Sequence, residues 1–327
     1  MMADGGGGGD DAFIYTGGEQ VVPNDVTHVI IDRSINIIPA RAFYGRKQLV
    51  SVETHDDLER IERHAFDGCH SLKGIKLIGV KVIERMAFHI CTDLLDVEFG
   101  DKLDTIQEGA FDGCLSLKSI VMTSIRAIES KAFSDCLQLT DVELPKGVER
   151  IEQFAFYYCP SLRRIAIPLK ADLFQLGSMD HRFTIFDACD DLTTVDLVGD
   201  EWIHKTISSL LLERWRNVMN QKIDYINQTL PNTIPSEKAD EIQYWIRSVI
   251  DKLEHYKVEH NRLLKEDMTQ LELALWKAKL DEKEEDSQLK LQAKRAKVDV
   301  ESMRREKRIM SGASIVIKNV LPFLKLG

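Results

Sequence analysis

The chain has 327 residues, 44% hydrophobic and 29% charged, which excludes an intrinsically disordered chain and fits one or two folded domains. The formal net charge of −10 is uneven, because residues 1–200 carry 20 basic and 33 acidic side chains whereas residues 201–327 carry 23 and 20. An acidic first part argues against nucleic acid as a partner.

The N-terminal segment, residues 1–20, contains the run Gly5–Gly9, which is typical of a flexible low-complexity lead. It lacks the basic and apolar regions of a secretory signal, so we expect a cytoplasmic protein with reduced thiols. Basic clusters near the C-terminus leave a nuclear location open. No run of about 18 apolar residues occurs, which argues against an integral membrane protein.

Residues 21–200 contain an internal repeat of 22 or 23 residues, I-x-x-x-A-F-x-x-C-x-x-L-x-x-I-x-L. Its phenylalanines are Phe43, Phe66, Phe88, Phe111, Phe133 and Phe156, and a seventh copy, IFDACDDLTTVDL, occupies residues 185–197. The L-x-x-I-x-L part predicts an alternating strand, and the A-F-x-x-C-x-x-L part predicts a short helical turn behind it. Stacked copies would form a parallel sheet, with residues 26–32 as an N-terminal cap.

The repeat resembles the BspA-type leucine-rich repeat over residues 26–197. The resemblance implies an α/β fold, a leucine-rich-repeat solenoid of about seven repeats followed by a long helical extension. That family is a recognition scaffold for varied ligands, so the resemblance implies partner binding and no particular reaction. Repeats followed by a long charged helix are also similar to a eukaryotic multicopy family, a resemblance that carries no activity with it.

The six cysteines all stand three residues after the repeat phenylalanine, at 69, 91, 114, 136, 159 and 189. A repeated small side chain indicates a core position, and the 22- to 30-residue spacings are unlike those of a zinc site. Cys69 precedes His70, a pairing that could indicate a nucleophile and its base, but His70 is not repeated. No phosphate-binding loop or histidine metal motif occurs, so we expect no cofactor, no metal and no catalytic residue.

The residues on either side of the central isoleucine of each predicted strand should point outward, since strand side chains alternate. Their exposed row would be either a solvated sheet face or a docking strip for a basic protein segment. The candidate partner-binding residues are Glu53, Lys76, Asp96, Glu98, Val121, Asp141, Glu143, Arg164 and Asp196.

Residues 201–311 predict a helical extension interrupted at 230–236, where two prolines occur. The apolar stripe of the second helix favours coiled-coil-like packing. Its partner would be the first helix of the same chain near the start, and a homodimer is left open. Residues 312–327 form an apolar tail after a basic segment.

Together these features predict a non-enzymatic protein-interaction scaffold, with partner binding on the strand face and a helical arm for packing or assembly. The alternative is a membrane-surface adaptor that uses the basic and apolar C-terminal segment. An enzyme is the third hypothesis, and the sequence supplies no motif for it.

Overall fold

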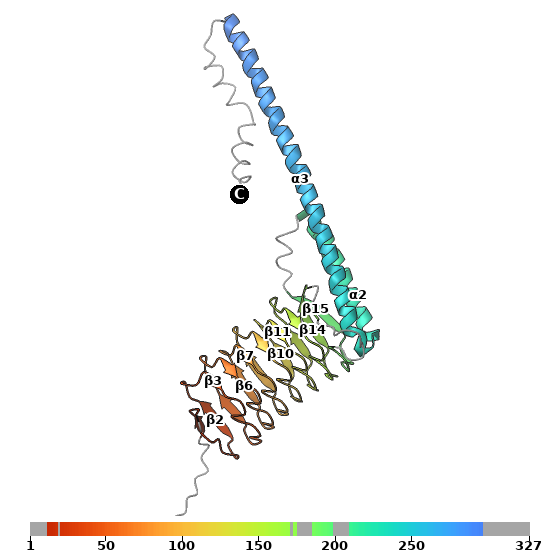
Figure 1. Cartoon of the computed structure of the whole chain (residues 1–327). Helices are drawn as coiled ribbons and strands as arrows, with labels where there is room; N and C mark the ends of the chain where they lie inside the picture. The colour runs from red at the N-terminus through yellow and green to blue at the C-terminus, as the bar shows by residue number, and fades with distance from the viewer. Residues whose placement is uncertain (1–11, 19, 171–172, 175–184, 199–208, 297–327) are drawn as a thin grey trace, which may run out of the picture. The chain divides into compact units, whose positions relative to one another are not determined.

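The computed structural model describes residues 12–18, 20–170, 173–174, 185–198 and 209–296. The chain divides into two units, residues 1–256 and 257–327, and the boundary falls within a long helix. The first unit is a solenoid of parallel strands followed by two helices (Figure 1).

The front sheet consists of the strands predicted from the L-x-x-I-x-L segments, preceded by two further strands. In chain order they are β1 (Phe13–Tyr15), β2 (His28–Ile31), β4 (Ser51–Glu53), β6 (Gly74–Leu77), β8 (Asp96–Phe99), β10 (Ser119–Val121), β12 (Asp141–Glu143), β14 (Arg164–Pro168) and β15 (Thr194–Val198). The ladder is interrupted between β8 and β10, which gives a 5-stranded and a 4-stranded part. β2 lies in the predicted N-terminal cap, whereas β1 lies in the segment that the sequence assigned to a flexible lead.

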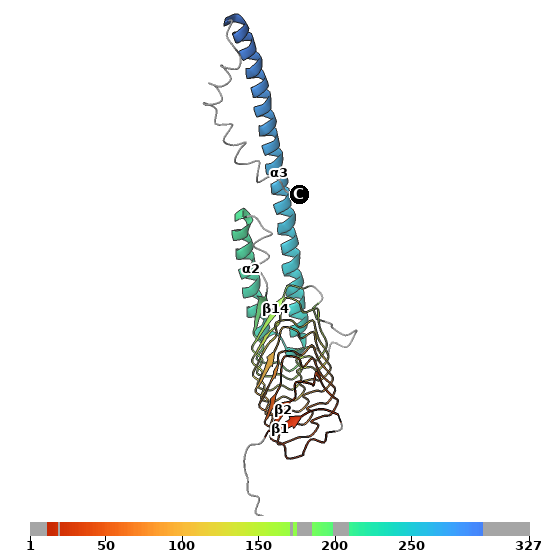
Figure 2. The same ribbon diagram turned by 90° about the vertical axis from the view of Figure 1, so that its left-hand side faces the viewer.

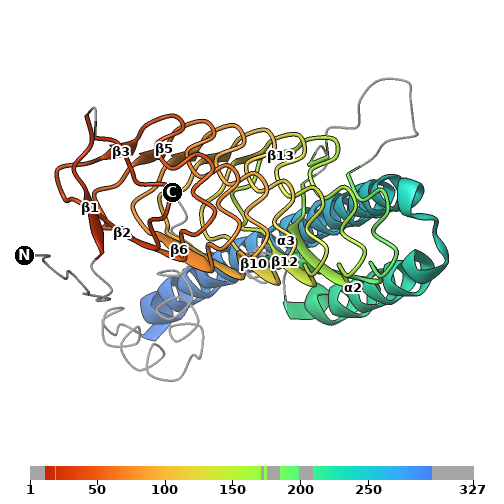
Figure 3. The ribbon, with the colours of Figure 1, turned by 90° about the horizontal axis from the view of Figure 1, so that it is seen from below.

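A second parallel sheet, the back sheet, runs along the opposite side of the solenoid (Figure 3) and was not predicted. Its 6 strands have two residues each: β3 (Ile37–Ile38), β5 (Arg60–Ile61), β7 (Val82–Ile83), β9 (Thr105–Ile106), β11 (Ala127–Ile128) and β13 (Arg150–Ile151). The isoleucine that opens each repeat is the second residue of each strand and is buried. The solenoid is therefore closed by sheet on two sides.

The prediction of a short helical turn in each A-F-x-x-C-x-x-L segment was wrong, because these segments form successive tight turns. Around Phe66, for example, His64 has a φ of 56° and Gly68 a φ of 75°. A right-handed helix needs negative φ throughout, so two left-handed residues four positions apart prevent it.

The core contains an unbroken stack of the repeat phenylalanine rings. Rings on neighbouring coils lie 4.9–5.9 Å apart between centroids and are parallel to within 13°. Tyr15 closes one end of the stack edge-on at 5.0 Å from Phe43, and Phe174 closes the other at 5.6 Å from Phe186. The repeat phenylalanines between these two rings are all 0% exposed, so the stack forms the central axis of the hydrophobic core.

Two helices, α2 (Ser209–Thr229) and α3 (Pro235–Ala296), follow the solenoid, with a short 3₁₀ turn, η2 (Leu230–Asn232), between them. α2 lies alongside the first part of α3 (Figure 2), where the Trp215 ring meets Tyr256 at 5.7 Å. The indole N–H of Trp245 donates to the Lys222 carbonyl at 2.7 Å. This is the intrachain packing that the sequence favoured for the start of the long helix.

Neither helix, over its described length, is long and apolar enough to cross a membrane. The apolar tail at 312–327 and the basic segment at 304–308 lie outside the described residues.

Candidate functional site

Two rows of residues face outward from the front sheet, and they contain all nine candidate residues. One row comprises His28, Ser51, Gly74, Asp96, Ser119, Asp141, Arg164 and Thr194. The other comprises Ile30, Glu53, Lys76, Glu98, Val121, Glu143, Ala166 and Asp196. Between the rows lie buried residues such as Val97 and Val142, so the alternation of the strands sets which side chains reach the surface.

Ala166 departs from the predicted outward pattern, because it is only 2% exposed. It lies at the end of the front sheet, where α2 packs against the neighbouring strand β15. There the side-chain oxygen of Asn227 on α2 accepts a hydrogen bond from the Val195 backbone N–H at 2.8 Å. The free edge of β15 is thus contacted by α2, whereas the Asp196 side chain on the outer face of β15 is still 39% exposed.

The two rows carry six carboxylates and two cations on the strands from β4 to β15. Lys76 lies 2.9 Å from Glu98 on the next strand, and this hydrogen bond raises the pKa of the lysine. Arg164 similarly pairs with Asp196 at 2.5 Å. The other four carboxylates make no ion pair with the described residues: Glu53, Asp96, Asp141 and Glu143.

Four of the six carboxylates lie on β8 and β12, the strands on either side of β10. Asp96 and Glu98 project from β8, and Asp141 and Glu143 project from β12. Between them β10 presents Val121, which is 58% exposed. Strands two positions apart in a sheet are separated by about 10 Å. We call Asp96, Glu98, Val121, Asp141 and Glu143 the acidic patch.

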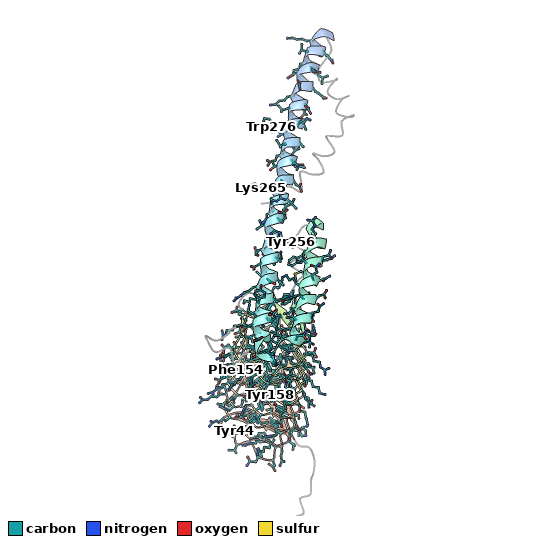
Figure 4. All side chains as sticks on the ribbon, turned by 90° about the vertical axis from the view of Figure 1, so that its right-hand side faces the viewer. Tyr44, Phe154, Tyr158, Tyr256, Lys265 and Trp276 are labelled. Carbon is teal, nitrogen blue, oxygen red and sulfur yellow. The ribbon has the colours of Figure 1, made fainter. Side chains whose placement is uncertain are left out.

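The large exposed aromatic side chains of the solenoid, Tyr44 and Tyr158, lie on its turns and not on the front sheet. Both are labelled in Figure 4. Tyr44 is 51% exposed beside the Arg41 guanidinium, and the Lys131 ammonium lies 6.0 Å from the Phe154 ring. The acidic patch therefore lacks the aromatic side chains that dominate tight protein interfaces.

A polar cluster on the turns was missed by the sequence analysis. The Nδ1 atoms of His64 and His89 lie 2.9 and 3.0 Å from the two carboxylate oxygens of Asp67. Asp112 occupies the same repeat position on the coil after that of His89, and burial raises the pKa of its carboxyl group. The sequence does contain a signal for this cluster. Asp67 and His89 occupy the same repeat position on successive coils, directly after the repeat phenylalanine.

The cysteines are buried, as predicted, and each thiol also has a hydrogen-bonding role that the sequence did not reveal. The Cys69 thiol donates to the Phe43 carbonyl of the preceding coil at 3.1 Å, and the other five repeat this contact. Burial raises the pKa of Cys69 to about 12, so its thiol stays protonated at neutral pH. A protonated and inaccessible thiol cannot act as a nucleophile with His70.

Within the described part of the chain, no group of three or more histidine, cysteine, aspartate or glutamate side chains is arranged to hold a metal ion.

The sequence matches a family model described as a BspA type leucine rich repeat region with 6 copies. The matches cover residues 23–136, 77–176 and 104–210, which together span more than half of the chain. The search of curated proteins found no match.

Solved leucine-rich repeat structures are also similar to this chain. A leucine rich cell surface protein from Faecalibacterium prausnitzii is 20% identical, over 55% of this chain and 62% of its own, with a TM-score of 0.36. A leucine-rich repeat protein from Bacteroides ovatus is 26% identical, over 53% and 55%, with a TM-score of 0.38. The leucine rich repeat protein of T. pallidum is 26% identical, over 57% and 70%, with a TM-score of 0.34. The chain thus spans less than two thirds of the length of the first two.

Proposed function

Because the chain belongs to the BspA-type leucine-rich repeat family, we propose that it is a non-enzymatic protein-interaction scaffold whose front sheet binds a basic segment of a protein partner. The helical extension would serve as an arm for packing or assembly. The observation that carries the proposal is the acidic patch, where three carboxylates without an ion-pair partner among the described residues surround exposed Val121.

The patch fits an extended segment that crosses the strands. Carboxylates on β8 and β12 would face lysine or arginine side chains about 10 Å apart on the partner. Val121 would contact the apolar part of those side chains, since lysine and arginine stems pack on apolar surface. Exposed ion pairs contribute little individually, so we expect a moderate affinity that falls as salt rises.

The non-enzymatic part of the proposal is supported by the state of the thiols. All six cysteines are free and buried, and burial raises the pKa of each. Free thiols also support our proposal of a cytoplasmic location, where cysteines stay reduced. Cell fractionation would test the location, and recovery outside the cytoplasmic fraction would contradict it.

The binding proposal is tested with a labelled peptide that alternates lysine with serine, measured by fluorescence anisotropy against the full chain. Neutralising the patch by Asp96→Asn, Asp141→Asn and Glu143→Gln should weaken binding by about tenfold at low salt. The control variant, Asp57→Asn, Asp101→Asn and Glu149→Gln, removes the same charge from exposed positions outside the two rows. Equal weakening in both variants would mean that net charge and not the patch binds the peptide, and the proposal would fail.

A further inference from the structure

The part of α3 that follows Tyr256 exposes apolar side chains at coiled-coil spacing. Leu264 is 46% exposed, Met268 52% and Leu271 37%, and Leu275 is half-buried. These residues step by four, three and four positions, which places them on one stripe of the helix. Earlier in α3, where it lies alongside α2, residues with the same spacing are buried: Ile242, Ile246, Val249 and Leu253. The exposed stripe has the same spacing but is shifted by one residue relative to the buried one, since Leu253 and Leu264 are 11 positions apart.

We propose that this stripe is the dimerisation surface of the protein, and that it pairs with the same stripe of a second copy running antiparallel. In a heptad, Leu264 and Leu271 take the d positions and Met268 and Leu275 take the a positions. An antiparallel pair sets a against d, so Leu264 meets Leu275 of the second copy and Met268 meets its Leu271. All four apolar positions then have apolar partners.

The flanking charges select this direction and register. Lys265 follows Leu264 and Glu272 follows Leu271, so both occupy e positions on the same edge of the stripe. In the antiparallel register, Lys265 faces Glu272 of the second copy, and the pair occurs twice by symmetry. Neither side chain makes an ion pair with the described residues of its own chain.

The other arrangements bring like charges together. A parallel pair in register would set Asp267 against Glu272 of the second copy on both edges. Moving the antiparallel pair by one heptad would set Glu272 against Glu272, or Lys265 against Lys265. Since like charges disfavour these alternatives, the antiparallel register is the one in which both apolar layers and charges match.

This inference deepens the assembly role in the proposed function and rests on that role alone. A dimer would carry two acidic patches, and two patches would strengthen binding to a partner with repeated basic segments. Peptide binding to a single patch does not depend on the dimer. The dimer proposal can therefore fail while peptide binding to the acidic patch holds, and peptide binding can fail while the dimer forms.

The test is sedimentation equilibrium of the full chain, 37.3 kDa, over a range of concentrations up to about 100 μM, since four apolar positions per helix form a short and weak coiled coil. The expected result is a reversible shift toward twice the monomer mass. Lys265→Glu and Glu272→Lys should each weaken the dimer by about tenfold, because each sets like charges face to face twice. The double variant should restore it, and circular dichroism checks that the helix is retained.

The matched control is Lys277→Glu, which makes the same charge change on another face of α3 and should leave association unchanged. A second readout is a disulfide between Leu264→Cys in one copy and Leu275→Cys in another, since the native cysteines are buried. Stronger association in either single-charge variant would overturn the inference, and in Glu272→Lys it would mean a parallel dimer, because that change relieves the contact between Asp267 and Glu272. A monomer at all concentrations would overturn it as well and would mean that another segment or partner covers the stripe.

Discussion

Ile90 has a φ of 54°, a left-handed backbone conformation that β-branched residues rarely adopt. It stands two positions after the repeat phenylalanine. The residue at this position has a positive φ in every coil: Gly45, Gly68, Ile90, Gly113, Asp135, Tyr158 and Ala188. Three coils use glycine here because glycine lacks the Cβ atom that makes positive φ costly. The repeat geometry thus imposes strain on Ile90 in particular.

We predict that Ile90→Gly raises the free energy of unfolding by about 1 kcal/mol, because relief of the left-handed strain exceeds the loss of a partly exposed side chain. Urea denaturation followed by circular dichroism measures the change. Ile90→Ala is the control, since alanine keeps the Cβ atom and should gain less. A lower midpoint for the glycine variant than for the unmodified protein would show that the Ile90 side chain contributes more by packing than it costs by strain.

At the scale of elements, the solenoid is closed at its C-terminal end by α3 through Lys238. The buried Lys238 ammonium donates to the carbonyls of Cys189, Asp190 and Leu192 at 2.9, 2.9 and 2.8 Å. Burial lowers the pKa of Lys238, so the three carbonyls compensate for a cation that has left water. Arg46 replaces the cysteine of the first coil and donates to the Val22 carbonyl, which closes the other end.

Lys238→Met should destabilise the protein by about 2–4 kcal/mol, because three buried carbonyls lose their donor while the side-chain volume is nearly kept. Urea denaturation followed by tryptophan fluorescence is suited to this test, since Trp245 lies on the same helix. Lys252→Met, at an exposed position of α3, is the matched control and should change stability little. If both variants unfold at the same urea concentration, Lys238 does not hold the cap.

The sequence predicted the front-sheet strands of the repeats, because each has the alternating pattern and the pattern recurs in every copy, but it missed β1, which precedes the repeats. It did not predict the back sheet, since two-residue strands such as Val82–Ile83 are too short to show a period. The left-handed turns were missed for a different reason, because residues such as Lys131 and Phe154 have no preference for positive φ.

The outward placement of the candidate site followed from the alternation, but its accessible extent did not. Ala166 is buried although the alternation places it on the outer face, and it pairs with β15, the strand against which α2 packs. The burial of Lys238 was indicated by the sequence, because this residue stands four positions before Ile242 on the apolar side of α3. A lysine at an apolar position of a helix indicates a buried partner, but the identity of that partner required the fold.

At the scale of the whole molecule, the solenoid has a weak junction in its middle. Each coil contacts its neighbours, so stability depends on the interfaces between successive coils. The front ladder is interrupted between β8 and β10, whereas the back sheet is continuous. The Phe111 ring spans this junction, with centroids 5.1 Å from Phe88 and 5.3 Å from Phe133.

We therefore predict that Phe111→Ala uncouples the two halves of the solenoid. The cavity should cost about 3–5 kcal/mol, and the junction would then be held chiefly by two-residue strands of the back sheet. Hydrogen exchange measured by mass spectrometry should show a large loss of protection in residues 26–99 and a smaller loss in residues 141–168, which the helices cap through β15. Phe43→Ala is the control, because a cavity in the first coil should leave protection at 141–168 unchanged. An equal loss of protection on both sides of Phe111 would mean that the solenoid unfolds as one cooperative unit, in which the interrupted ladder has no effect on stability.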